Sequence, residues 1–339
     1  MRALFLIFFQ IYLVQCQNTS KPFSYIGKKH WGVSLAAPSN VIDHKPFEKI
    51  KSIGTSSITL MPYAFLPKNE AQIRFSYDST KHQQWWGETP EGIRKCIDLA
   101  HSQSLEVMIK PHLWIAGGEF TGNLDFENTQ KWELFERSYL AYILFFAQIA
   151  EEKHISGFCI GTELANHVKK RPEFWLKLIV EIRNIYHGKL TYAENWDKYA
   201  KVPFWNKLDF IGVDAYFPLS SKKDPDLNTI KNAWKEHAEA LKYQSGKWQK
   251  PILFTEIGYR SNDNALEKPW ETDYSKPINE ELQARAYQAF FEQINHEPWF
   301  AGAYIWKWET GTHHMGEYKD SFTPQNKLAE KVIERNFKK

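Results

Sequence analysis

Cysteine is scarce in this chain of 339 residues, which contains 3. Cys16 belongs to the N-terminal segment discussed below, so Cys96 and Cys159 remain for the folded part. Two cysteines cannot build the disulfide framework of a small secreted scaffold. We expect both to be buried as small hydrophobic residues and to stay unpaired.

The sequence also lacks a surplus of one charge sign. Its 43 Lys and Arg residues face 40 Asp and Glu residues, which leaves a net charge of +3 spread along the chain. Nucleic-acid-binding proteins usually carry a basic stripe or patch, so nucleic acid is not an expected partner. His313 and His314 are adjacent, unlike the i, i+4 pair of a helical zinc site. We therefore predict no metal and no cofactor.

Long apolar runs are absent except at residues 3–14, which follow Met1 and Arg2. This run is too short to span a membrane and is typical of a secretory signal. The stretch LVQC, which ends at Cys16, also resembles a bacterial lipoprotein box, although Gln15 stands where a small residue is usual. We expect an exported protein, either secreted or periplasmic, or anchored to a membrane through lipidated Cys16. Residues 1–20 then form the signal with a short linker, and residues 21–339 form one domain.

No internal repeat, low-complexity segment or linker divides the rest of the chain, where short apolar runs alternate with amphipathic stretches. The predicted strands are 31–35, 56–61, 106–112, 157–162, 189–193, 209–214, 252–256 and 302–306. The predicted helices are 46–53, 90–104, 128–154, 172–186, 227–246, 279–296 and 325–337. Eight strands with mostly helical connections predict an α/β fold, a single (β/α)₈ TIM barrel.

Alternation along the predicted strands separates an apolar face from a face that becomes polar toward each C-terminal end. The apolar face suits the layer of helices. We expect the inner face to carry Met108, Lys110 and His112, then Cys159, Gly161 and Glu163, then Gly212, Asp214 and Tyr216, then Ile252, Phe254 and Glu256, and finally Gly302, Tyr304, Trp306 and Trp308. A barrel whose inner face turns polar at this rim is typical of an enzyme.

Two carboxylates stand at matching strand ends. Glu163 follows the fourth predicted strand in CIGTEL, and Glu256 ends the seventh in LFTEIGY. Since these strands lie across the barrel mouth, both side chains can face one cleft. Glycoside hydrolysis needs such a pair, in which one acid protonates the leaving oxygen and one carboxylate attacks or stabilises the anomeric carbon.

Three other acids compete for these roles. Asp214 points inward by parity, and we expect it to form an ion pair with a neighbour such as Lys110. Glu194 has the parity of Tyr192 and is expected to point outward, and Glu309 lies in a loop beyond the last strand. A rim glutamate can also be a merely structural partner of Lys or Arg, so the pairing of Glu163 with Glu256 carries the prediction.

The order of these motifs resembles the clan A glycoside hydrolases, and within that clan it most resembles glycoside hydrolase family 113. The similar segments are WGVSL, MIKPHLW, CIGTEL, DFIGVDAYFPL, ILFTEIGYRS and YIWKW, which together span most of residues 30–310. The resemblance implies a retaining (β/α)₈ enzyme. The known activity of this family is mainly that of an endo-β-1,4-mannanase. It implies that Glu163 is the acid/base and Glu256 the nucleophile, with carboxyl groups about 5–5.5 Å apart.

The resemblance also assigns roles around the pair. Tyr216 would donate a hydrogen bond to the nucleophile, and Trp306 would be the platform beneath the sugar at the cleavage point. The remaining residues expected to line the cleft are Lys110, His112, Asn195 and Trp196. Many clan members carry Asn before the acid/base, where it contacts the sugar 2-hydroxyl, but this chain has Thr162.

Three functions stay open on the sequence. The first is an exported retaining hydrolase that cleaves β-1,4-mannosidic linkages of mannan-type polysaccharides or oligosaccharides. The second is another clan A β-glycosidase, either a β-glucanase or an exo-acting enzyme. The third is a non-catalytic glycan-binding barrel, which would have no need of a matched acid and nucleophile.

Overall fold

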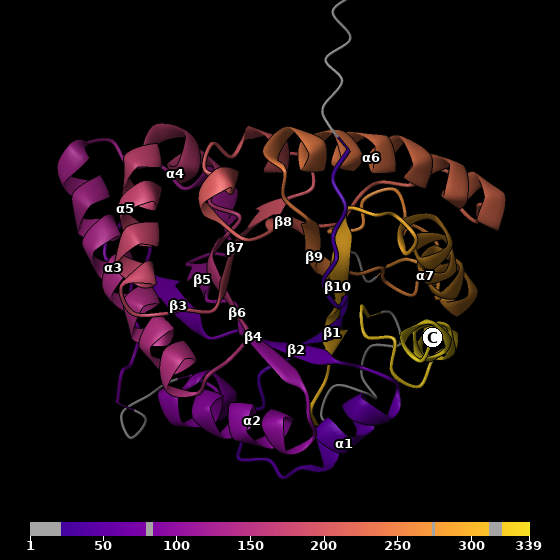
Figure 1. The fold of residues 1–339 in the computed structure, drawn as a ribbon, viewed down its shortest axis with the longest axis horizontal. Coiled ribbons are helices and arrows are strands. Elements are labelled where there is room, and N and C mark those ends of the chain that lie inside the picture. The colour runs from indigo at the N-terminus through magenta and orange to yellow at the C-terminus, as the bar shows by residue number, and fades with distance from the viewer. Residues whose placement is uncertain (1–21, 79–83, 273–274, 312–320) are drawn as a thin grey trace, which may run out of the picture.

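Eight parallel strands close into one barrel with helices around its outside (Figure 1). The order around the barrel is β1-β10-β9-β8-β7-β6-β4-β2, and β1 pairs with both β10 and β2. The strands are β1 (His30–Leu35), β2 (Ser57–Leu60), β4 (Glu106–Ile109), β6 (Gly157–Thr162), β7 (Lys189–Asn195), β8 (Ile211–Asp214), β9 (Ile252–Ile257) and β10 (Phe300–Trp308). The predicted single (β/α)₈ barrel is confirmed.

This computed structural model describes residues 22–78, 84–272, 275–311 and 321–339. The predicted signal with Cys16, and the pair His313 and His314, lie outside the described residues. No helix in the described ranges is both long and apolar enough to cross a membrane.

Helices follow the strands, and four of them begin at a residue whose side chain caps the first turn. They are α1 (Lys45–Ser52), α2 (Pro90–Ser102), α3 (Thr129–Glu152), α4 (Ala165–Lys170), α5 (Pro172–Arg183), α6 (Leu227–Trp248), α7 (Glu280–Ile294) and α8 (Leu328–Phe337). The side chains of Thr89, Asn128, Asp226 and Asn279 accept hydrogen bonds from backbone N–H groups in the first turns of α2, α3, α6 and α7. The short helix α4 was not predicted.

A second, two-stranded sheet consists of β3 (Tyr63–Leu66) and β5 (His112–Ile115), which pair in parallel. The sequence predicts one strand over 106–112, but β4 ends at Ile109 and β5 begins at His112. Pro111 lies between them and has no N–H to donate to a strand ladder. The chain therefore leaves the barrel sheet here and continues in a separate pair of strands.

Buried side chains form two groups, one inside the barrel and one between the barrel and its helices. The barrel interior holds Met108, Cys159, Ala193, Phe210, Leu253, Ala301 and Tyr304. The layer under the helices holds the opposite strand faces, for example Val107 and Ile109 of β4. Cys96 and Cys159 are both buried and free, as predicted.

Strict alternation fails in β9, and this corrects the predicted inner face. Leu253 lies in the barrel interior, whereas Ile252 and Phe254 lie in the layer under the helices. The register between β8 and β9 shifts where the partners change from Val213–Phe254 to Asp214–Glu256. Such a bulge lets two consecutive residues face the same side. Thr255 and Glu256 therefore both point inward, where Thr255 donates to Asp214 at 2.8 Å.

The same irregularity occurs in β6 and β10. The register of β6 shifts between Cys159 and Thr162, and a Cβ on Gly161 would lie 2.7 Å from the Trp175 ring, in the layer under the helices. Gly161 therefore faces outward, contrary to the prediction. Trp308 also lies in that layer and not on the inner face, after a register shift between β1 and β10.

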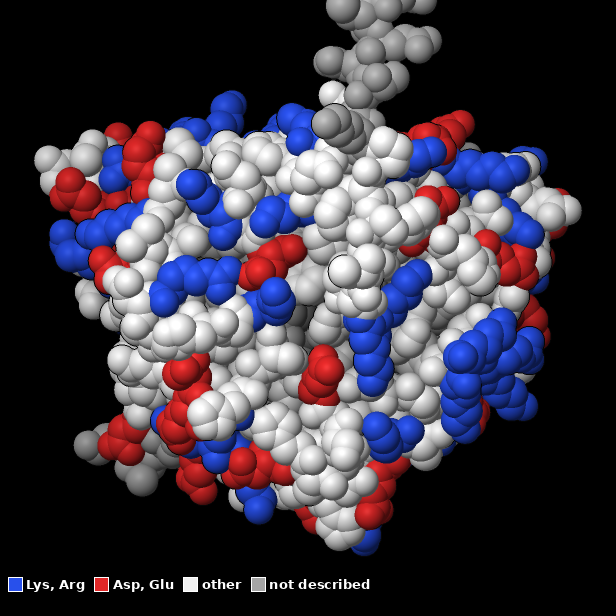
Figure 2. Space-filling view, viewed as in Figure 1, with Lys and Arg blue, Asp and Glu red and all other residues white. Residues whose placement is uncertain are grey.

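Charged residues of both signs are interspersed on the face of the molecule that Figure 2 displays. Lys and Arg side chains alternate there with Asp and Glu side chains, and neither sign forms a continuous stripe on this face. The view agrees with the balanced composition of the sequence.

Candidate active site

A cavity of about 650 Å³ lies at the C-terminal ends of the barrel strands. It is lined by Tyr63, His112, Leu113, Trp114, Gly118, Glu119, Phe120, Thr121, Thr162, Glu163, Asn195, Tyr216, Glu256, Trp270, Thr272, Trp306 and Phe322. Glu163 and Glu256 thus enter one cavity from β6 and β9, which are separated by β7 and β8 in the barrel.

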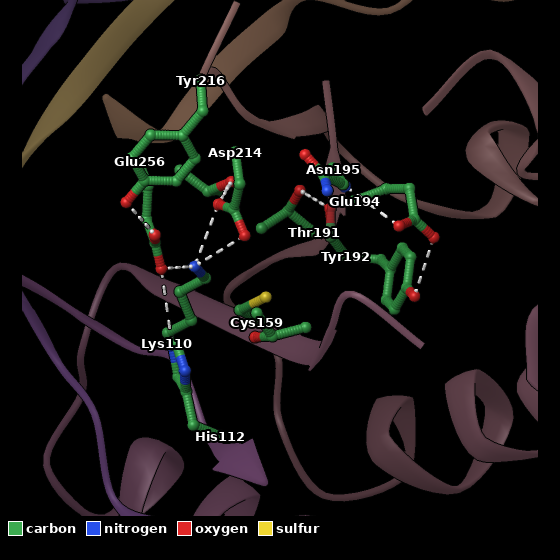
Figure 3. A network of polar contacts seen from close by, with 12 residues as sticks. Lys110, His112, Cys159, Thr191, Tyr192, Glu194, Asn195, Asp214, Tyr216 and Glu256 are labelled. Carbon is green, nitrogen blue, oxygen red and sulfur yellow. Dashed lines mark hydrogen bonds and ion pairs between the residues drawn. The ribbon is translucent and has the colours of Figure 1, made fainter. Parts of the chain in front are cut away.

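Glu256 is held by two side chains at the base of this cavity (Figure 3). The ammonium group of Lys110 donates to its Oε1, and the Tyr216 hydroxyl donates to its Oε2 at 2.6 Å. Glu256 is only 5% exposed. Both carboxylate oxygens therefore have a donor, which fixes the orientation of the group.

Lys110 lies beneath Glu256 and is completely buried. Its ammonium group also donates to both oxygens of Asp214, at 3.0 and 3.1 Å. This is the ion pair that the sequence predicts for Asp214. Burial lowers the pKa of Lys110, but attraction to Asp214 and Glu256 outweighs this effect and raises the pKa above its ordinary value.

The pKa of Glu256 reflects opposing influences. Burial and the neighbouring Asp214 carboxylate raise the pKa of Glu256 to about 7, while Lys110 and the Tyr216 hydrogen bond act to lower it. One ammonium group thus faces two carboxylates inside the barrel. The Lys110 charge and the Tyr216 hydroxyl both favour the ionised form of Glu256.

Glu163 is held through its backbone rather than its carboxyl group. Its φ of 51° is in the left-handed region, its N–H donates to the Ala193 carbonyl at 2.8 Å, and its carbonyl accepts from the Thr121 hydroxyl at 3.1 Å. In the described part of the chain, no side chain or backbone group donates to the Glu163 carboxyl. Burial, Asp214 and Glu256 raise the pKa of Glu163 well above its ordinary value.

A second network lies behind Glu163, on the outer side of β7. The backbone N–H of Leu164 donates to the Tyr192 hydroxyl at 2.8 Å, and that hydroxyl donates to Glu194 at 3.1 Å. Glu194 also accepts from the Asn195 N–H at 2.9 Å, as Figure 3 shows. Glu194 therefore turns away from the cavity, yet it is buried, and burial raises its pKa to about 7.

His112 forms part of the wall beside Glu256. Its Nε2 lies 3.7 Å from Glu256 Oε1, and its ring stacks on Trp306 with centroids 6.2 Å apart. Burial and the nearby Lys110 charge lower the pKa of His112 well below its ordinary value, so the imidazole is neutral. Within the described ranges, His112 Nε2 has no hydrogen-bond partner. This neutral ring nitrogen is buried and lies next to the Glu256 carboxylate.

The structure brings most of the predicted site residues together. Those that line the cavity are His112, Glu163, Asn195, Tyr216, Glu256 and Trp306. Lys110 and Trp196 do not line it. Lys110 is buried beneath Glu256, and Trp196 packs behind the cavity wall, where its ring stacks on Trp270 with centroids 5.6 Å apart.

Sequence reasoning missed several residues of the wall, above all Tyr63, Trp114 and Trp270. Tyr63 and Trp114 lie on β3 and β5, and the stretches YAFL and HLWI do carry the alternation of a strand. That signal could have revealed both residues. Trp270 follows β9 in a segment without regular structure, where no periodicity marks it.

Two glutamates that enter one cavity at the C-terminal rim of a (β/α)₈ barrel define the class of protein, a barrel glycoside hydrolase. No group of three or more metal-ligating side chains is present in the described residues. The chain belongs to Glycoside Hydrolase Family 113, whose family model matches residues 43–327.

Solved structures support the same fold. The GH113 beta-mannanase AaManA from Alicyclobacillus acidocaldarius, in complex with ManMIm, has a TM-score of 0.80 at 22% identity over 92% of this chain and 98% of that chain. A GH113 beta-1,4-mannanase has a TM-score of 0.77 at 21% identity over 92% of this chain and 99% of that chain. A beta-glucuronidase from Faecalibacterium prausnitzii has a TM-score of 0.63 at 12% identity over 94% of this chain and 51% of that chain. A comparison with curated proteins found no match.

Proposed function

We propose that the protein is an exported retaining endo-β-1,4-mannanase that acts by double displacement. The observation that carries the mechanism is the contrast within one cavity between Glu256, bound by Lys110 and Tyr216, and Glu163, whose carboxyl accepts no hydrogen bond from any described residue. Paired carboxyl groups in unlike surroundings suit the roles of nucleophile and acid. The mannanases among the similar structures favour mannan as substrate.

In the first step, the Glu256 carboxylate attacks the anomeric carbon while Glu163 gives its proton to the departing glycosidic oxygen. The bond between the anomeric carbon and that oxygen breaks, and a glycosyl ester forms on Glu256. In the second step, Glu163, now ionised, takes a proton from water as the water oxygen attacks the anomeric carbon. The ester bond then breaks, and Glu256 and Glu163 return to their starting states.

Tyr216 and Lys110 have positioning roles in this scheme. Their hydrogen bonds hold the Glu256 carboxylate and stabilise its ionised form before attack. His112 and Asn195 line the same cavity and present polar atoms to a sugar, and Trp306 presents an aromatic surface. Thr162 also lines it, at the position before the acid/base.

A panel of mannan, glucomannan, xylan and cellulose, with product identification, tests the substrate. We expect internal cleavage of mannan, no turnover by Glu256→Ala, and normal turnover by Glu236→Gln, which alters an exposed glutamate on α6. Preferred cleavage of cellulose or release of single sugars from chain ends would instead support a different β-glycosidase. Glycan binding without turnover of any substrate by the wild type would favour a binding protein.

The stereochemistry of the first product tests the mechanism. Proton NMR during hydrolysis should detect the β anomer of the new reducing end before mutarotation, because two inversions retain the configuration. The α anomer as the first product would contradict double displacement.

Export is tested by expressing the full chain and a Cys16→Ser variant in a bacterial host and comparing their distribution between medium, membrane and cytoplasm.

A further inference from the structure

The segment that connects β5 to α3, residues 116–128, runs along the catalytic cavity and reaches the chain that follows Glu163. It contains the 3₁₀ turn η2 (Thr121–Asn123), which packs against α4. The residues of this segment that line the cavity are Gly118, Glu119, Phe120 and Thr121. One stretch of chain therefore forms part of the cavity wall and also contacts the helix that begins directly after Glu163.

The Thr121 hydroxyl makes the contact nearest to Glu163. It donates to the Glu163 carbonyl at 3.1 Å, whereas the Glu163 carboxyl accepts no hydrogen bond from any described residue. The φ of Glu163, 51°, is uncommon for a residue other than glycine and has to be maintained by its surroundings. A donor that fixes the peptide group after the Glu163 Cα also fixes the direction in which the side chain leaves the main chain.

Two further contacts fasten the segment to α4. The side-chain amide of Asn166 donates to the Asn123 carbonyl at 3.4 Å, and Lys170 forms an ion pair with Asp125. Asn166 and Lys170 are one helical turn apart, so both project from the same face of α4. The segment thus lies along that face, and its contacts with α4 place the Thr121 hydroxyl beside the Glu163 carbonyl.

The first residues of the segment offer little support of their own. Gly117 and Gly118 have φ values of 84° and 72°, and a Cβ on either would find no heavy atom of the described structure within 4 Å. Beyond η2, Leu124 is buried in the layer under the helices. The position of Thr121 therefore depends on Leu124 and on the contacts with α4, and not on packing around the two glycines.

We propose that Thr121 is a positioning residue for the acid/base Glu163, and that the contacts of Asn123 and Asp125 with α4 hold its hydroxyl in place. Proton transfer requires the Glu163 carboxyl to lie within hydrogen-bond distance of the leaving oxygen. Thr121 acts on this distance through the Glu163 main chain. The proposal rests on the proposed function, because it takes Glu163 as the acid.

A series of aryl β-mannobiosides, whose leaving phenols differ in pKa, tests this role. An acid in the correct position protonates the phenol as the bond breaks, so kcat/KM depends only weakly on the pKa of the phenol. Thr121→Val removes the hydroxyl at nearly constant volume. We expect it to lower kcat/KM by about 10-fold for phenols of high pKa and much less for dinitrophenol, which needs no proton. Thr121→Ser, which keeps a hydroxyl, should restore the weak dependence.

Two other variants sharpen the test. Ser102→Ala is the control, because the exposed Ser102 hydroxyl on α2 also donates to a main-chain carbonyl, that of Leu99 at 2.7 Å, but lies outside the cavity. It should keep the wild-type dependence on leaving group. Lys170→Met breaks the ion pair with Asp125 and should steepen the dependence less than Thr121→Val does. An unchanged dependence in Lys170→Met would overturn the contribution of the α4 contacts.

An equal loss of kcat/KM on every leaving group in Thr121→Val would show a general structural defect and would overturn the role of Thr121. So would a wild-type dependence in Thr121→Val beside a steep dependence in Glu163→Ala. Failure of the proposed function gives a different pattern, since Glu163→Ala itself would then keep the wild-type dependence. If the polysaccharide panel identifies another sugar, the aryl series is made with that sugar.

Discussion

The two glutamates of the cleft are held in opposite ways. The Glu256 carboxylate is bound directly by Lys110 and Tyr216, whereas Glu163 is fixed through its main chain by Ala193 and Thr121. A carboxylate that must attack one carbon atom benefits from a fixed orientation and from charge that keeps it ionised. An acid that must first give and then take a proton benefits from a carboxyl group free of strong donors.

The difference extends to the residues behind each glutamate. Lys110 and Asp214 continue the Glu256 network into the barrel interior, while Tyr192 and Glu194 support the main chain after Glu163 from the outer side of β7. Charge therefore supports one glutamate, and backbone hydrogen bonds support the other. Variants on the two sides should change different parts of the reaction.

Removing either glutamate should give the largest effect. Under the proposed mechanism, Glu256→Ala and Glu163→Ala should each reduce mannan hydrolysis by about 10⁴-fold or more, since it places both residues in the chemical steps. On dinitrophenyl β-mannotrioside, Glu163→Ala should still form the glycosyl-enzyme, because this leaving group needs no proton. Of the two variants, only Glu163→Ala should therefore show a burst of dinitrophenol release in stopped-flow measurements.

Azide separates the two roles further. It should convert the glycosyl-enzyme of Glu163→Ala to the β-mannosyl azide, and it should give the α-mannosyl azide with Glu256→Ala, where it replaces the missing nucleophile. NMR of the azide products reads the anomer. The reverse pattern would exchange the assignments of Glu163 and Glu256.

Lys110→Met should give the next largest effect. It removes the positive charge between Glu256 and Asp214, so we expect kcat/KM to fall by about 10²–10³-fold. Without the ammonium group the pKa of Glu256 rises, and since Glu256 must be ionised to attack, the acidic limb of the pH profile should move to higher pH.

Stability provides a second measurement of Lys110. Loss of one partner from a buried ion pair destabilises a protein by about 3–5 kcal/mol, which urea unfolding at neutral pH can measure. Lys153→Met is the control, because Lys153 pairs with Asp98 at the surface, at 2.9 Å, and should contribute about 0–1 kcal/mol. An unshifted acidic limb in Lys110→Met would show that Lys110 does not control the ionisation of Glu256.

Tyr216→Phe should act in the same direction with a smaller effect. It removes one hydrogen bond to Glu256, of 2.6 Å, but leaves the Lys110 charge in place. We expect a loss in kcat of about 10-fold, and a shift of the acidic limb to higher pH that is smaller than in Lys110→Met. Full pH profiles of the two variants, measured in one buffer series, test the order. A larger shift in Tyr216→Phe would contradict the view that charge outweighs the hydroxyl.

The sequence predicted the barrel and the glutamate pair because both depend on local patterns. Alternating strands, capped helices and carboxylates at strand ends can all be recognised without knowledge of the fold. The interior face of β9 could not be predicted in this way, since the bulge that turns Thr255 and Glu256 inward together arises from pairing with β8. The assumption of regular alternation therefore placed Ile252 and Phe254 on the wrong face.

The walls of the cleft were less predictable than its base. Pro111 interrupts the strand from which Lys110 comes, so His112 and Trp114 belong to a separate sheet with β3. Trp270 lies outside helices and strands, and only the tertiary fold brings it to the cleft. The sequence thus predicted the residues at the base of the cavity better than the residues of its walls.

Tyr192→Phe should give the smallest effect of these variants. It tests the support of the main chain after Glu163 and not the support of Glu256. It leaves the Leu164 N–H without its acceptor and removes one donor from Glu194, which should lower the free energy of unfolding by about 1–3 kcal/mol. Because the main chain after Glu163 then loses a support, we expect kcat on mannan to fall a few-fold. The acidic limb of the pH profile should stay in place, since Lys110 and Tyr216 still hold Glu256. Dinitrophenyl substrates should be nearly unaffected in the first step, because they need no proton from Glu163. A shift of the acidic limb in Tyr192→Phe would mean that the two sides of the cleft are coupled, and that the separation between charge support and backbone support is wrong.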